Sequence, residues 1–176
     1  ADVGVVGDRI VAVGDLSQKK SQQVIDATDR IVCPGFIDVH VHSEISLLGG
    51  RDQHAGVIQG VTTQLLAPDG FGWVGLDLQT ASQFWQYTKF AYADFPSELA
   101  VEAFNWQTPE AYLEIFAGRT PTNVCPQVPH CTVRLAAMGW EDRPAAPDEL
   151  KQMEQETRSW MEAGAVSYTH LTLPTK

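Results

Sequence analysis

Two histidines and an aspartate stand at alternate positions near residue 40 of this 176-residue chain. Asp38, His40 and His42 follow the spacing i, i+2, i+4 in the run FIDVHVH. On an extended strand such residues point to the same face, and two imidazoles about 7 Å apart can converge on one metal ion. An HxH pair is common, and two half-buried histidines with satisfied hydrogen bonds would show the same spacing. The spacing alone is therefore a weak indication of a metal site.

The elements around this pair are predicted to be parallel β/α units. Strands are expected at 36–42, 61–66 and 123–128, and helices at 52–60, 81–94, 109–117 and 147–163. The last helix is the clearest, because Pro147 and two acidic residues suit its first turn and Gly164 follows its end. Strands that alternate with helices are typical of an α/β fold with a parallel sheet.

The first 33 residues predict a separate, small β unit. Apolar runs at 3–6 and 9–13 flank Gly7-Asp8, which is a hairpin signal. Another strand-like run, within 24–33, ends at Pro34-Gly35, where we place a boundary. This unit is too short to bury a core by itself.

The composition excludes some classes of protein. Twelve Lys and Arg against 22 Asp and Glu give a formal charge of −10, which argues against a nucleic-acid surface. No apolar run approaches the roughly 20 residues of a membrane helix. Three cysteines without CxxC spacing do not indicate a disulfide framework, so a reducing compartment, the cytoplasm, is expected.

Several segments, in the same order, resemble the amidohydrolase superfamily. IVCPGFIDVHVH is similar to its first barrel strand, GVTTQLLAPDGFG to the second strand and loop, and VVGDRIVAVGD to the small β-sandwich before the barrel. The stretch from NWQTPEAYLEIF to MEAGAV resembles the N-acyl-D-amino-acid deacylase (D-aminoacylase) branch. The resemblance implies part of a β-sandwich domain over 1–33 and the first part of a TIM-type (β/α)8 barrel over 34–165.

The same resemblance implies roles for four residues. His40 and His42 would be zinc ligands. Asp69, in Pro-Asp-Gly, stands where many relatives carry a cysteine ligand, and a carboxylate can also bind zinc; alternatively it only makes the turn. His130 would contact substrate or support the site, or be a structural histidine at the strand end. Glu44 could hydrogen-bond at the rim but receives no role.

The implied activity is zinc-dependent hydrolysis of a linear amide, releasing a D-amino acid from a small-molecule N-acyl amino acid. The general-base Asp and further His ligands of such enzymes come from later strands, so we expect them beyond this sequence and expect the isolated 176-residue piece to be inactive. Two alternatives stay open: a dihydroorotase-like or hydantoinase-like hydrolase of cyclic amides, and a non-catalytic metal-binding barrel protein. The acyl chain, amino acid, metal count and oligomeric state are not predicted.

The end of the chain has an unusual resemblance. VSYTHLTLPT, residues 166–175, can be encoded by DNA that resembles the adapter of transposase-based sequencing libraries. We therefore expect residues 166–176 to be a non-native tail. A real strand-like tail is the alternative, because the segment contains several residues that favour strands.

Overall fold

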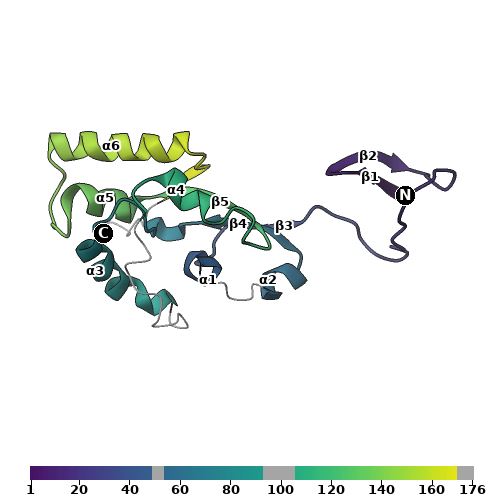
Figure 1. The fold of residues 1–176 in the computed structure, drawn as a ribbon, viewed down its shortest axis with the longest axis horizontal. Helices are drawn as coiled ribbons and strands as arrows, with labels where there is room; N and C mark the ends of the chain where they lie inside the picture. Colours follow the sequence, from purple (N-terminus) through teal and green to yellow (C-terminus); the bar gives the residue numbers. More distant parts are fainter. Residues whose placement is uncertain (49–53, 93–105, 170–176) are drawn as a thin grey trace, which may run out of the picture. The chain divides into compact units, whose positions relative to one another are not determined.

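The computed structural model describes residues 1–48, 54–92 and 106–169 (Figure 1). The chain divides into two compact units, Ala1–Pro34 and Gly35–Lys176. Within the described ranges, no helix combines the length and apolar character needed to cross a membrane.

The first unit contains a β-hairpin. Strands β1 (Asp2–Val6) and β2 (Arg9–Gly14) pair antiparallel, and Gly7 occupies the turn with φ 60°. The predicted hairpin is therefore confirmed. The strand expected within 24–33 is wrong: the backbone N–H and the hydroxyl of Thr28 both donate to the Asp26 carboxylate, at 2.9 and 2.7 Å, and this turn interrupts the extended run.

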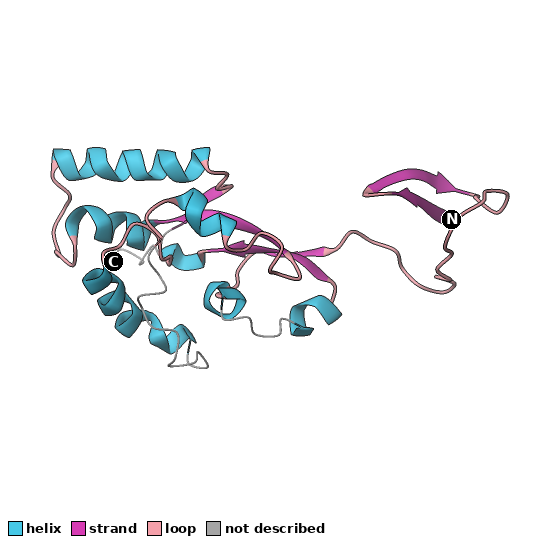
Figure 2. Cartoon of the chain, viewed as in Figure 1, coloured by secondary structure: helices cyan, strands magenta, loops and turns pink. Residues whose placement is uncertain are grey.

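The second unit is built on a parallel sheet. Its strands lie in the order β3 (Phe36–Asp38), β4 (Val61–Leu66), β5 (Asn123–Pro129) and β6 (Ser167–Thr169), and each neighbouring pair is parallel (Figure 2). A parallel sheet with helical connections is the arrangement of a partial (β/α)8 barrel. The predicted α/β class is confirmed, and β4 and β5 match the expected strands closely.

Helices connect these strands. They are α1 (Glu44–Leu48), α2 (His54–Ile58), α3 (Leu78–Thr88), α4 (Pro109–Glu114), α5 (His130–Met138) and α6 (Pro147–Glu162), with short 3-10 turns η1 (Pro68–Gly70) and η2 (Lys89–Tyr92). Helix α3 begins before the predicted residue 81 because Asp77 caps it, accepting from the Thr80 N–H at 2.7 Å. Residues 52–53 and 93–94 of the expected helices lie outside the described residues. The sequence did not predict α1 or α5.

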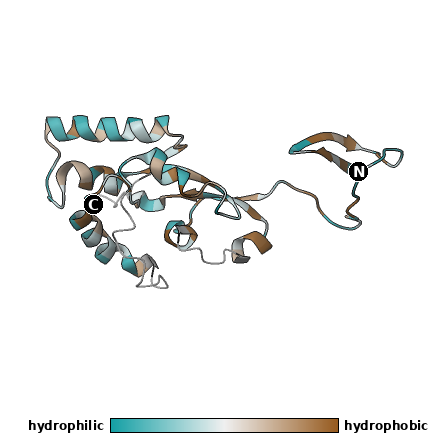
Figure 3. Ribbon diagram, viewed as in Figure 1, coloured by the Kyte–Doolittle hydropathy of each residue, from teal (hydrophilic) through white to brown (hydrophobic). Residues whose placement is uncertain are grey.

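Helix α6 confirms the clearest expectation from the sequence. Glu149 accepts from the Ala146 N–H at 2.7 Å and forms a bidentate ion pair with Arg143. These contacts stabilise the first turn of the helix. Gly164, with φ 108°, follows the end of the helix. The helix is largely polar in Figure 3, but its Trp160 is only 1 % exposed.

Two apolar clusters form the core of the second unit. One joins the segment after η1 to helices α1, α3 and α5, and contains Ile45, Phe71, Trp73, Leu76, Ala81, Phe84 and Leu135. The other joins β4, β5, α4 and α6, and includes Leu66, Tyr112, Val128, Val133 and Trp160. The second cluster includes Leu66 at the end of β4 and Val128 near the end of β5, and the candidate site lies just beyond the carboxyl ends of β3 and β4.

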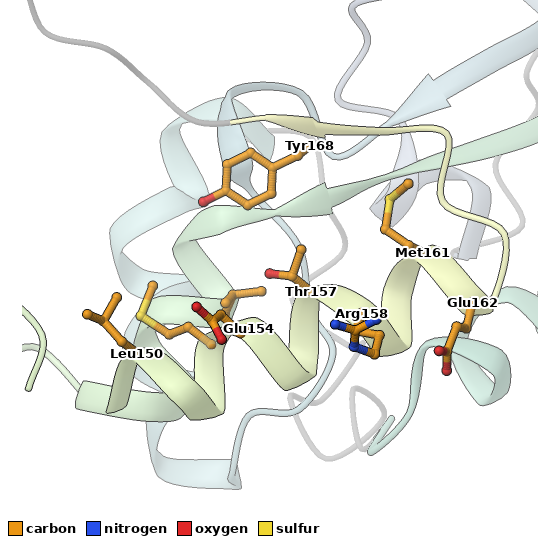
Figure 4. A pocket seen from close by; sticks show the side chains of 9 residues that line it. Leu150, Glu154, Thr157, Arg158, Met161, Glu162 and Tyr168 are labelled. Atoms are coloured by element: carbon orange, nitrogen blue, oxygen red, sulfur yellow. The ribbon is translucent and has the colours of Figure 1, made fainter. Parts of the chain in front are cut away.

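Strand β6 lies within the segment expected to be a non-native tail. It pairs with β5 through Gln127, Val128 and Pro129. A groove of about 660 Å³ between α6 and β6 is lined by Leu150, Met153, Met161 and Tyr168, among others (Figure 4). This groove shares no residue with the histidine pair, and the origin of the tail stays a prediction.

Candidate metal centre

The histidine pair lies in a loop and not on the predicted strand. The strand expected over 36–42 is wrong beyond residue 38, because β3 ends at Asp38. The carboxylate of Asp38 accepts from the His40 backbone N–H at 3.1 Å, a local bond that turns the chain out of the extended conformation. His40 and His42 therefore follow the carboxyl end of β3, where (β/α)8 barrels place their active sites.

A carboxylate from a different loop meets both histidines. Oδ2 of Asp69 lies 3.4 Å from Nε2 of His40 and 3.3 Å from Nε2 of His42. One donor atom from each of the three residues lies within 4.8 Å of the other two. The structure thus brings together the three residues that the sequence suggested as ligands, although their role as ligands stays a prediction.

The separations between these donor atoms suit a zinc ion. In a tetrahedral site, ligand bonds of about 2.0–2.2 Å place neighbouring donor atoms roughly 3.3–3.5 Å apart. Both nitrogen–oxygen distances at Asp69 fall in that range. The donor set of two imidazoles and one carboxylate also matches zinc chemistry. The three residues would therefore fit a metal ion without a large movement.

The cluster is open on one side. The side chain of His40 is 62 % exposed, whereas those of Asp69 and His42 are 31 % and 23 % exposed. Behind His42, the ring of Phe71 lies 5.7 Å away between centroids and belongs to the packed core. A bound ion would therefore be held from the protein side and reached from the exposed side, as catalytic metal sites require.

The Asp69 carboxylate is presented by a strained turn. Both Ala67 and Asp69 have left-handed backbones, with φ 60° and 58°. The Phe71 N–H donates to the Pro68 carbonyl at 3.1 Å and closes the turn. Left-handed backbone is uncommon in residues other than glycine and concentrates at functional sites. The turn-forming role considered for Asp69 and its position beside the imidazoles are thus compatible.

Sequence reasoning missed the buried polar groups behind this cluster. Glu44 is 1 % exposed and does not lie at the rim as expected; its Oε1 accepts from the Ala67 N–H. Burial raises the pKa of Glu44 to about 7. Next to it, Ser43 Oγ donates to Gln64 Oε1 at 2.5 Å, and Gln64 Nε2 donates to Thr122 Oγ1 at 2.9 Å. Glu44 stands among His42, Ser43 and Ser46, so no local pattern could have indicated the buried carboxylate.

His130 is the first residue of α5, directly after β5. Its Nδ1 is hydrogen-bonded to the Tyr168 hydroxyl, and among the described residues His130 does not belong to the cluster of His40, His42 and Asp69. The Sγ atom of its neighbour Cys131 lies 3.9 Å from the Asp69 carbonyl oxygen. Burial, with a smaller effect of the Asp69 charge, raises the pKa of this thiol, so Cys131 is a protonated group at neutral pH. The substrate role of His130 stays a prediction.

Comparison with known proteins decides the family. Residues 23–171 match the sequence profile of the amidohydrolase family. The chain belongs to the amidohydrolase family. This confirms the resemblance seen in the sequence, and the match includes the beginning of the expected tail.

Relatives of this chain include enzymes of the deacylase branch. D-aminoacylase of Alcaligenes xylosoxydans xylosoxydans is 32 % identical over 171 residues, which cover 94 % of this chain and 32 % of the relative. A solved D-aminoacylase, described by its binuclear metal center, superposes with a TM-score of 0.75 at 32 % identity, over 96 % of this chain and 34 % of that one. N-acyl-D-glutamate deacylase of Bordetella bronchiseptica, solved with zinc and a phosphonate inhibitor, gives a TM-score of 0.66 at 25 % identity, over 92 % and 32 %. This amidohydrolase chain thus spans about a third of the length of these relatives.

Proposed function

We propose that this chain is the N-terminal part of a zinc-dependent hydrolase that releases D-amino acids from N-acyl-D-amino acids. The observation that carries the proposal is the meeting of one Asp69 oxygen with Nε2 of both His40 and His42. The similarity to D-aminoacylase and to a zinc-bound N-acyl-D-glutamate deacylase supports the choice of substrate and metal. The cytoplasmic location stays a prediction from the cysteine pattern.

Each residue of the cluster has a distinct task in this proposal. His40 and His42 would bind the metal through Nε2, with neutral imidazoles, and Asp69 would contribute a negative charge that partly neutralises the ion. A bound zinc ion polarises an amide carbonyl and makes water a better nucleophile. The general-base Asp and the remaining ligands are expected from strands that follow this part of the barrel.

The test is hydrolysis by the full-length protein that the gene encodes. Purified protein would be treated with a chelator, reloaded with Zn²⁺, and offered N-acetyl-D-amino acids, their L-enantiomers, dihydroorotate and hydantoin. We expect zinc-dependent turnover of the D-enantiomers, and a loss of at least 100-fold in kcat/KM for His42→Asn. Ring opening of the cyclic amides in place of D-deacylation would establish the alternative hydrolase. No turnover of any substrate, with zinc bound, would support a non-catalytic metal-binding protein.

A further inference from the structure

We propose that Glu44 is the positioning residue of the metal centre: its buried side chain fixes the turn at residues 67–69 against the loop that carries His40 and His42. The inference rests on the proposed metal site and adds a residue outside the ligand set. Glu44 lies two residues after His42, whereas Ala67 lies two residues before Asp69. The hydrogen bond between Glu44 and Ala67 thus connects the two chain segments that carry the proposed ligands. Each of the two bonded residues is two sequence positions from a proposed ligand.

The burial of Glu44 indicates a local geometric requirement. Its side chain is 1 % exposed, and among the described residues Oε2 is buried without a hydrogen-bond partner. A buried carboxyl group that is only partly hydrogen-bonded opposes folding. Because burial of the carboxyl group costs free energy, an apolar side chain at this position would suit general stability better. What the carboxyl group adds is an acceptor for one particular backbone N–H.

That N–H belongs to the point where the chain leaves β4. Ala67 follows the last residue of the strand and adopts φ 60° and ψ 43°. Since left-handed backbone is unfavourable for alanine, the surrounding structure must select it. The Ala67 N–H donates to Glu44 Oε1, and this buried hydrogen bond joins Ala67 to the segment that carries His40 and His42. The left-handed turn then directs Asp69 Oδ2 to 3.3 Å from His42 Nε2.

A second buried link provides a matched control. Ser43 Oγ donates to Gln64 Oε1, so it connects the histidine-bearing loop to β4. Gln64 lies inside the strand, three residues before Ala67. The link therefore joins the loop to the body of the sheet without contacting the turn. Loss of the Ser43 bond should loosen packing, whereas loss of the Glu44 bond should move the Asp69 carboxylate.

The experiment measures Co²⁺ binding to the full-length protein. Affinity would be determined by competition with a chelating dye, and the ligand environment by the visible absorption of bound Co²⁺. We expect Glu44→Met to weaken Co²⁺ binding at least tenfold and to change the absorption in the same way as Asp69→Ala. Glu44→Gln retains an acceptor oxygen and should stay within about threefold of the wild type. Ser43→Ala should lower the melting temperature and leave both Co²⁺ readouts unchanged.

A double variant separates positioning from general destabilisation. If Glu44 acts through Asp69, Glu44→Met should cause no further loss of affinity in an Asp69→Ala background. Independent, multiplying losses would overturn the inference, as would a Glu44→Gln variant as damaged as Glu44→Met. Should Glu44→Met fail to fold, Glu44→Asp keeps the carboxyl group but retracts it by one methylene, and the same spectral change is expected; an unchanged spectrum would contradict positioning. If the wild-type protein binds no Co²⁺, the metal site itself is overturned. If the wild type binds Co²⁺ and the Glu44 variants bind it with the same affinity and absorption, only this inference is overturned.

Discussion

Asp69 Oδ2 lies 3.3 Å from His42 Nε2, although 27 residues and a complete strand separate the two in the chain. The contact forms because β3 and β4 are parallel neighbours, so the loops at their carboxyl ends emerge at the same edge of the sheet. The same oxygen also lies 3.4 Å from His40 Nε2. One carboxylate oxygen thus lies beside both imidazoles.

Changing Asp69 should change the metal preference of the site. We expect Asp69→Ala to weaken Zn²⁺ binding by the full-length protein at least tenfold, because one anionic ligand is lost. Asp69→Cys should restore Zn²⁺ binding and favour Cd²⁺ over Zn²⁺ more strongly than the wild type does, since thiolates prefer soft ions. Competitive titration with both ions measures the ratio. Equal ratios for the Asp and Cys proteins would mean that residue 69 does not contact the metal.

His130 should affect substrate binding and leave metal binding intact. His130→Ala is expected to raise KM for N-acyl-D-amino acids about tenfold with zinc content unchanged, because His130 follows β5 at the mouth of the barrel without belonging to the three-residue cluster. Steady-state kinetics and metal analysis on the same preparation measure both effects. His40→Ala is the contrast, since it should lower zinc content. Loss of zinc in His130→Ala would instead identify His130 as a ligand.

The ion pair at the start of α6 should make stability depend on pH. The hydrogen bonds from Arg143, and then from the Ala146 N–H, lower the pKa of Glu149 from its usual 4.5 to about 2. A lowered pKa in the folded state stabilises the protein above pH 4.5, and this contribution disappears as the pH falls from 4.5 towards 2. We expect Glu149→Gln to reduce the melting temperature at pH 7 but to differ little from the wild type near pH 2.

Thermal unfolding of the full-length protein, followed by circular dichroism from pH 2 to 7, measures this difference. Glu162→Gln, at the exposed end of the same helix, controls for the removal of one carboxylate from this helix. If the melting temperatures of Glu149→Gln and the wild type differ by the same amount at every pH, the ion pair does not contribute through its charge.

The 176-residue chain on its own should fold poorly and lack activity. Strand β3 is at one edge of the four-stranded sheet, and its Phe36 and Ile37 side chains are 58 % and 59 % exposed. Uncovered edges with apolar side chains favour aggregation. We expect light scattering on heating without a cooperative transition, and no deacylation. A sharp, reversible transition together with turnover would contradict this prediction.

The sequence was sufficient for the features that depend on short stretches of chain. Strand β4 and helix α6 were predicted almost to the residue, because a short run of strand-forming residues, an N-terminal proline and a terminal glycine act within a few positions. The resemblance in PGFIDVHVH likewise indicated the amidohydrolase family, which the comparison confirmed. These signals are local, and no distant contact is needed to interpret them.

Only the tertiary structure decided how the site is assembled. A single hydrogen bond from the His40 N–H to Asp38 ends β3 early, so the histidines converge from a loop and not from one strand face. Helix α5 begins at His130 where the sequence suggested only the end of a strand. The burial of Glu44 and its bond to Ala67 depend on two loops that pack together from distant parts of the chain. Residue types and spacing determine which groups are available, but the packing of parallel strands determines which of them meet.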